Sequence, residues 1–79
     1  MGATDISFSC ARATAVSIRV YDLSGRRVCD LVNAVMPPGA HSVHWNGTND
    51  RGVAIAPGVY IYRMTTAYNA FSRKLILQR

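Results

Sequence analysis

The sequence predicts an all-β fold, a small antiparallel β-sandwich of six to seven short strands. Apolar and polar residues alternate along most of the chain, which is the periodicity of strands with one buried face. Residues that favour turns recur every 8 to 14 positions and divide this alternation into short runs. Glutamate is absent and Lys74 is the only lysine, although amphipathic helices usually depend on both residue types.

The length allows one domain, which we assign to residues 1–79. Hydrophobic residues make up 49% of the chain and charged residues 16%, a balance typical of a folded globule rather than a disordered chain. Met1-Gly2-Ala3 is expected to be an added start rather than part of the domain. No apolar run is long enough for a membrane span, and no signal-peptide pattern opens the sequence.

Three strands are expected in the first half of the chain. Apolar residues occupy alternate positions in residues 6–10 and 16–21, and each run predicts one strand. Ser24-Gly25 predicts a tight hairpin turn, because glycine adopts a positive φ at little cost. The third strand is expected over residues 28–32, where the step from Val28 to Leu31 breaks the alternation and indicates a β-bulge.

The second half begins with a firm interruption at Met36-Pro37-Pro38-Gly39, because proline cannot donate a hydrogen bond to a sheet. The elements expected after it are a strand at 41–45, a polar loop at 46–52, a short extended piece at 53–55, a strand at 59–66, a turn at Tyr68-Asn69 and a strand at 71–78. All of these strands are short, as in a small sandwich.

The core is predicted from the residues that share one face within each strand. Trp45 is expected to fill its centre, since aromatic burial is the largest single contribution to so thin a core. Tyr60 and Tyr62 are expected to bury their rings and keep their hydroxyls at a polar rim. The predicted core residues are Phe8, Val16, Ile18, Val20, Val43, Trp45, Tyr60, Tyr62, Met64, Leu75 and Leu77.

The inventory of reactive side chains predicts no catalytic, cofactor or metal site, and therefore no enzyme. Four scattered aspartates form no carboxylate pair. His41 and His44 are three residues apart on one strand and so point to opposite faces, which is poor geometry for a metal. The loop at 46–52 holds one carboxylate, Asp50, which favours Asx turns over calcium binding.

Two cysteines, Cys10 and Cys29, permit two interpretations. They can form one disulfide, as in an exported domain, or remain as separate thiols that fill small apolar positions. The sequence leaves both open.

The net charge of +5 also needs an interpretation. Eight of the nine basic residues are arginines, and they are spread along the whole chain rather than clustered. Scattered arginines on the outer faces of strands keep a β-rich surface soluble. We therefore expect no specific binding of nucleic acid.

The turn motifs follow one another in an order that resembles a known family. The motifs are Val20-Tyr21-Asp22-Leu23-Ser24-Gly25-Arg26, then Val28 and Leu31, Pro38-Gly39, Val43-His44-Trp45-Asn46-Gly47, Asn49-Asp50-Arg51-Gly52, Pro57-Gly58-Val59-Tyr60-Ile61-Tyr62-Arg63 and Arg73-Lys74-Leu75-Ile76-Leu77. In this order they resemble the Ig-like domain of the flagellar hook-capping protein and the related C-terminal sorting domains of type IX secretion substrates. The resemblance covers roughly residues 4–79 and implies an Ig-like sandwich.

The resemblance implies a non-catalytic extracellular or cell-surface module of a bacterial protein, most directly a C-terminal sorting or attachment domain. Its sorting determinant would lie at Arg73, Lys74, Leu75, Ile76 and Leu77, with Arg79 extending the basic tip. The alternative is a self-assembling subunit of an extracellular filament, joined through strand edges or through the terminal segments 1–5 and 72–79. Face-to-face packing through Val59 and Ile61 is a third possibility. The expected partners are accordingly secretion or surface proteins, or copies of this chain in a homo-oligomer.

Overall fold

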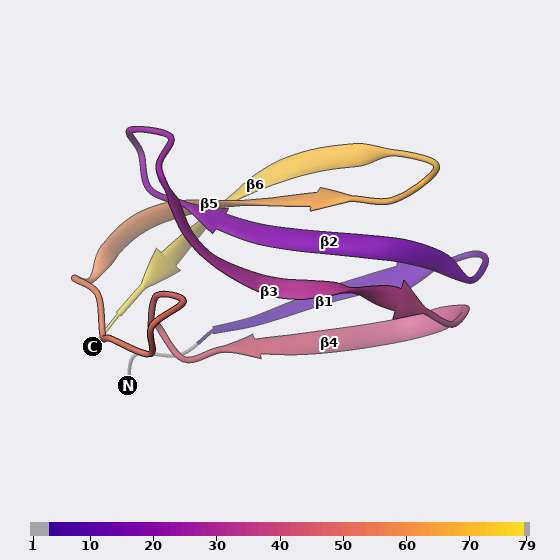
Figure 1. Ribbon diagram of the computed structural model, residues 1–79, viewed down its shortest axis with the longest axis horizontal. Helices are drawn as coiled ribbons and strands as arrows, with labels where there is room; N and C mark the ends of the chain where they lie inside the picture. Colours follow the sequence, from indigo (N-terminus) through magenta and orange to yellow (C-terminus); the bar gives the residue numbers. More distant parts are fainter. Residues whose placement is uncertain (1–3, 79) are drawn as a thin grey trace.

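The computed structural model describes residues 4–78, and the regular elements in this range are six strands. The strands are β1 (Thr4–Cys10), β2 (Thr14–Tyr21), β3 (Arg27–Met36), β4 (Gly39–Trp45), β5 (Gly58–Thr65) and β6 (Ala70–Leu77). Every pair of neighbouring strands is antiparallel. The predicted all-β sandwich is confirmed (Figure 1). Within residues 4–78 there is no helix that could cross a membrane.

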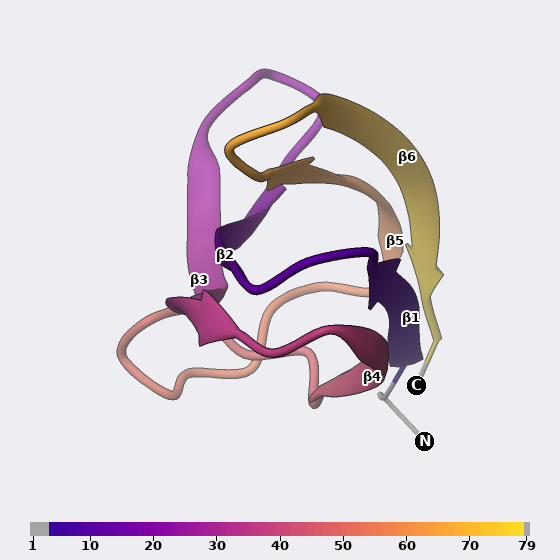
Figure 2. The same cartoon turned by 90° about the vertical axis from the view of Figure 1, so that its right-hand side faces the viewer.

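The strands form two layers of unequal width. One sheet has the order β1-β4 and the other the order β3-β2-β5-β6. The chain changes layer after β1, after β3 and after β4, so neither sheet is built from a continuous stretch of sequence. The view along the sandwich shows the wider sheet curving over the two-stranded one (Figure 2). The start of β1 and the end of β6 lie at the same end of the molecule (Figure 1).

The predicted hairpin turn between β2 and β3 is held by one carboxylate. Oδ1 of Asp22 accepts hydrogen bonds from the N–H of Ser24 at 2.9 Å, the hydroxyl of Ser24 at 2.6 Å and the N–H of Arg26 at 3.0 Å. These bonds to the charged form hold the pKa of Asp22 below its usual range, the Ser24 hydroxyl having the largest effect. Gly25 has a φ of 90°, a conformation that favours glycine.

Strand β3 is longer and more irregular than the sequence predicts. Its pairing with β2 skips Leu31 and then Val28, so it carries two bulges where the sequence predicted one. It also extends to Met36, because its ladder with β2 continues past Val32. The sequence did not predict this part, since Asn33 and Ala34 are residue types of low strand propensity. The predicted extended piece at 53–55 is not a strand. It contributes only an isolated bridge between Thr48 and Ala54.

The core lies between the two sheets, and most of the predicted residues are in it. The buried members of the predicted set are Val16, Ile18, Val20, Trp45, Tyr60, Met64, Leu75 and Leu77. Phe8, Val43 and Tyr62 are only partly buried and pack against this cluster. The structure also buries Ile6, Cys10 and Cys29, which the predicted set omitted. Alternation gives the face of a strand correctly, but the depth of burial depends on which part of the wide sheet the narrow sheet covers.

Trp45 joins the narrow sheet to the rest of the core. Its side chain is 1% exposed and makes an edge-on contact with the ring of Tyr60 on β5, with ring centroids 5.6 Å apart. Its indole N–H donates a hydrogen bond to the carbonyl of Thr48 at 3.0 Å. The hydroxyl of Tyr60 donates to the carbonyl of Ala56. Both polar groups are therefore satisfied in the loop between β4 and β5.

We expect Trp45→Ala to lower the free energy of unfolding by about 3 to 5 kcal/mol, because it leaves a cavity where the two sheets meet. A domain of this size has little stability beyond that amount, so the variant should be largely unfolded. Denaturant titration followed by circular dichroism measures the difference. The matched control is Tyr68→Ala, an aromatic residue that is 62% exposed, which should change stability by no more than about 1 kcal/mol, because it loses only an exposed contact with Arg12. An unchanged stability of Trp45→Ala would contradict this description of the core.

Candidate functional site

The C-terminal strand does not present its candidate residues as one surface. Leu75 and Leu77 are buried in the core, whereas Lys74 and Ile76 lie on the outer face of β6. Arg73 shares the parity of the core residues but is exposed, with its guanidinium 5.1 Å from the ring centroid of Phe71. Arg79 lies outside the described residues. A partner at the outer face could therefore touch Lys74 and Ile76 but not the two leucines.

The outer face of β5 and β6 carries exposed apolar side chains. Ile76 is 58% exposed and pairs in register with Val59, which is 37% exposed. Ile61 pairs with Lys74 in the same ladder. Leu23, from the hairpin turn, lines a shallow apolar pocket of about 190 Å³ with Ile61 and Lys74. The sequence analysis named face-to-face packing through Val59 and Ile61 as one possible contact, and both residues belong to this face.

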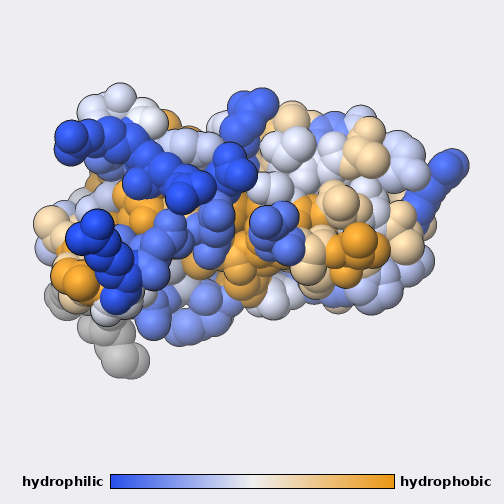
Figure 3. All heavy atoms as spheres, in the orientation of Figure 1, coloured by the Kyte–Doolittle hydropathy of each residue, from blue (hydrophilic) through white to orange (hydrophobic). Residues whose placement is uncertain are grey.

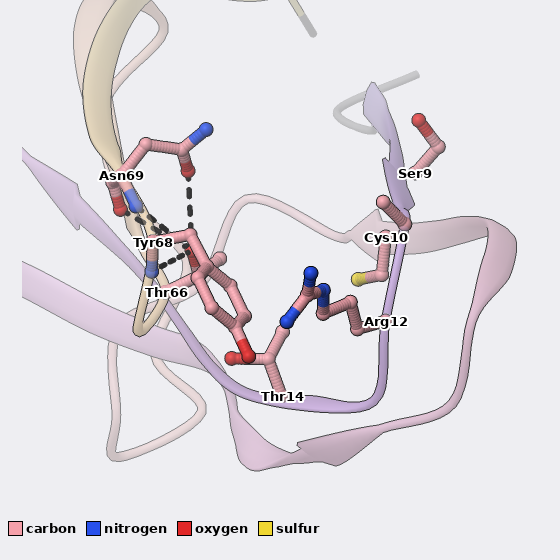
Figure 4. A pocket seen from close by; sticks show the side chains of 8 residues that line it. Ser9, Cys10, Arg12, Thr14, Thr66, Tyr68 and Asn69 are labelled. Carbon is pink, nitrogen blue, oxygen red and sulfur yellow. Dashed lines mark hydrogen bonds between the residues drawn. The ribbon is translucent and has the colours of Figure 1, made fainter.

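A second pocket lies at the end of the sandwich where the β1–β2 and β5–β6 connections meet. It has a volume of about 280 Å³ and is lined by Ser9, Cys10, Ala11, Arg12, Thr14, Thr66, Tyr68 and Asn69. The guanidinium of Arg12 lies 5.4 Å from the ring centroid of Tyr68 (Figure 4). The buried hydroxyl of Thr14 accepts a hydrogen bond from the N–H of Ala67 at 3.2 Å. The lining contains neither a carboxylate nor a histidine.

The two histidines occupy separate environments, as their spacing predicted. Nδ1 of His44 lies 2.7 Å from a carboxylate oxygen of Asp5, with both side chains well exposed. Nε2 of His41 lies 2.7 Å from the carbonyl oxygen of Pro37, and its ring contacts Phe8. Within residues 4–78, no cluster of three or more potential metal ligands is present.

The polar loop between β4 and β5 is tied to the edge of β3. The N–H of Asp50 donates to the carbonyl of Val28 at 3.3 Å, and Oδ1 of Asp50 accepts from the N–H of Asp30 at 3.0 Å. Arg27 lies 3.5 Å from the carboxylate of Asp30 and 3.6 Å from that of Asp50. Arg19 lies 3.0 Å from Asp30 on its other side. The ion pairs are partly exposed and individually weak, but together they fix the position of the loop.

Cys10 and Cys29 are both buried and both free, so the structure selects separate thiols over the disulfide. Burial raises the pKa of the Cys29 thiol from 9.0 to about 11, and the nearby carboxylates of Asp50 and Asp30 act in the same direction. A raised pKa keeps the thiol neutral at physiological pH and therefore unreactive. Cys29 serves as a small apolar core residue.

We expect the folded state to lose stability as pH rises from about 9 towards 11, because the Cys29 thiol ionises more readily in the unfolded chain than in the folded one. The contribution of the neutral Cys29 thiol to stability is fully present below pH 9 and is lost as the pH rises past the folded-state pKa of about 11. Denaturant titrations at several pH values, with a reductant present, measure it. The Cys29→Ala variant should show a smaller loss over this interval than Cys10→Ala, which retains Cys29. Equal losses in the two variants would contradict the assignment.

Some arginines lie side by side, since Arg26, Arg27 and Arg51 line one pocket and Arg19 pairs in register with Arg63. Among the described residues, Arg19 and Arg27 are paired with aspartates, and Arg12 and Arg73 lie over aromatic rings. We expect the chain to bind double-stranded DNA only weakly and without sequence preference, with the affinity lost at modest salt. Fluorescence anisotropy with two unrelated duplexes at low and physiological salt tests this. Sequence-selective binding at physiological salt would overturn it.

Comparison with known proteins gives one family and several similar structures. A family model described as the FlgD Ig-like domain matches residues 2–70. The structure of FlgD from P. aeruginosa superimposes with a TM-score of 0.73 at 22% identity, covering 95% of this chain and 59% of that one. FlgD from Xanthomonas campestris, described in connection with hook capping in flagellar assembly, gives a TM-score of 0.73 at 24% identity, covering 96% of this chain and 56% of that one. No curated protein matches.

This chain therefore spans less than two thirds of the length of these two structures. At these identities the structural similarity establishes the fold, while the family match establishes the relationship over most of the sequence.

Proposed function

The chain belongs to the FlgD Ig-like domain family, and we propose that it acts as a non-catalytic structural module of a flagellar hook-capping protein. The family match over residues 2–70 carries the proposal. The similarity of fold to two FlgD structures, across 95% and 96% of the chain, supports it. The proposal implies an extracellular location, because a cap covers the outer end of the hook that it helps to assemble.

The surfaces of the domain suit contacts with proteins rather than chemistry on a small molecule. The outer face of β5 and β6 combines exposed apolar side chains with Lys74, and β3 and β6 are the edge strands of the wide sheet. The pocket beside Leu23 is shallow, and the pocket at the end of the sandwich holds neither a carboxylate nor a histidine. In this proposal the sandwich holds these contact surfaces in fixed positions. Its partners are other flagellar proteins or further copies of the capping protein.

The sorting interpretation receives no support from the comparisons, and we do not propose it. The matches are to hook-capping proteins. The buried positions of Leu75 and Leu77 also mean that their side chains could not be recognised without unfolding the end of β6. The assembly alternative, in which the domain works through contacts between protein copies, is closer to the family assignment.

Domain exchange tests the proposed function. The Ig-like domain of FlgD from P. aeruginosa is replaced by this chain in a strain that lacks its own FlgD, and hooks are counted by electron microscopy. We expect the chimera to restore hooks to at least a measurable fraction of the wild-type number, because the exchanged domains share one fold over nearly the whole chain.

Two controls define the result of the exchange. A chimera that carries an unrelated Ig-like sandwich of similar size should not restore hooks. A chimera with Trp45→Ala, in which the domain should not fold, should also fail. If this chain performs no better than the unrelated sandwich, the proposal is wrong.

A further inference from the structure

Two basic side chains on the outer face of β5 and β6 have no acidic partner. Arg63 and Lys74 are both exposed, and within residues 4–78 neither forms an ion pair. Arg63 lies opposite Ser72 of β6, and Lys74 lies opposite Ile61 of β5. The two cations are therefore diagonal neighbours on one face of the sheet, close enough for their long side chains to meet one ligand.

Arg63 also faces a like charge on its other side. It pairs in register with Arg19 of β2, and directly opposed like charges destabilise a sheet. Arg19 is held by the carboxylate of Asp30 at 3.0 Å and by a hydrogen bond to the side chain of Tyr21. An anion beside Arg63 would relieve the repulsion that remains.

This chain has no side-chain carboxylate left to supply that anion. The sequence contains four acidic residues. They are engaged with His44, in the β2–β3 turn and in the ion pairs of Arg27, and they are Asp5, Asp22, Asp30 and Asp50. A carboxylate that balances Arg63 and Lys74 therefore has to come from another molecule. A second copy of this chain, with a net charge of +5 and the same engaged aspartates, is a poor source.

An apolar hollow lies beside the two cations. It has a volume of about 190 Å³ and is lined by Leu23, Ile61, Ser72, Arg73 and Lys74. Small-molecule sites usually have about 300–1,000 Å³, so this hollow suits one side chain of a protein better than a whole small ligand. Its lining contains no aromatic ring on which a nucleic-acid base could stack. The hollow therefore favours a protein as the source of the carboxylates.

We propose that this face binds an acidic segment of another protein, with one aliphatic side chain in the hollow and carboxylates beside Arg63 and Lys74. In an extended segment, residues two positions apart lie on the same face. Acidic residues two positions before and two positions after an aliphatic residue therefore suit cations that adjoin the hollow. Complementary charge selects such a partner, and the apolar contact fixes its position.

The other group of arginines is less suited to this role. Figure 3 shows hydrophilic side chains gathered over the β2–β3 turn. Arg26, Arg27 and Arg51 line a pocket there together with Asp22 and Asp50. This pocket already contains two carboxylates, which repel an acidic segment. Its arginines serve as a matched control for the cations of β5 and β6.

The inference goes beyond the proposed function, because it gives the chemistry of the partner. Its test uses the purified chain and a synthetic peptide, so a negative result leaves the hook-capping proposal unaffected. Failure of the domain exchange would equally leave the peptide result standing.

The probe is a short peptide capped at both ends, Gly-Ser-Asp-Ser-Leu-Ser-Asp-Ser-Gly, titrated into the chain while amide chemical shifts are followed by NMR. We expect weak, saturable binding, with the largest shifts in residues 61–63 and 72–74. A peptide with serine in place of leucine should bind more weakly, because it leaves the hollow empty. A peptide with asparagine in place of both aspartates should also bind more weakly, because it loses the charge pairs.

Variants of the chain identify the residues that bind the peptide. Arg63→Gln combined with Lys74→Gln should weaken binding by at least about threefold. Arg26→Gln combined with Arg51→Gln removes the same net charge and should leave the affinity nearly unchanged. All four side chains are exposed, so both double variants should fold.

The hollow is tested by a second pair of variants. Leu23→Ser should weaken binding of the leucine peptide, because it removes one wall of the hollow. Val53→Ser is the control, since Val53 is a similarly exposed apolar residue outside the hollow, and it should have little effect.

Three results would overturn the proposal. One is the absence of saturable peptide binding, and another is an equal loss of affinity in the two double variants. The third is tighter binding to vesicles that contain an anionic lipid, or to a DNA duplex, if Arg63→Gln with Lys74→Gln abolishes it. That result would assign the face to a membrane or to nucleic acid in place of a protein.

Discussion

The burial of Trp45 is the interaction on which the rest of this structure depends. A chain of 79 residues has a thin core, and a sheet of only two strands cannot hide its inner face without a large side chain to fill the space between the layers. Trp45 meets Tyr60 from the opposite sheet and bonds to the loop that follows β4. One side chain thereby couples the narrow sheet, the wide sheet and the longest connection between them.

That connection has a second role, which depends on the first. Because the indole of Trp45 holds Thr48, the loop leaves β4 in a fixed direction and brings Asp50 to the edge of β3. Asp50 then supplies both a donor and an acceptor to backbone groups that an edge strand otherwise leaves unpaired. The core and the edge are thus linked through a few residues of polar loop, although the loop itself buries little.

The functional character of the domain follows from what its surfaces hold. Its buried thiols are free, its carboxylates are engaged in turns and ion pairs, and its histidines are separated. The outside of the described residues carries apolar side chains, arginines and strand edges. Such a surface can position protein partners in an assembly, which is consistent with a module of a hook-capping protein.

The sequence by itself determined the all-β class, the turn at Ser24-Gly25, the break at Pro37-Pro38 and the inner face of the strands other than β3, because these depend on local periodicity and on the backbone limits of glycine and proline. Only the tertiary structure decided the depth of burial, since Phe8 and Tyr62 have core parity but lie where cover is incomplete. It also decided the state of Cys10 and Cys29, the second bulge in β3 and the closure of half its edge by Asp50. These features depend on segments that are distant in the sequence, and alternation along one strand carries no information about which distant segment will lie beside it.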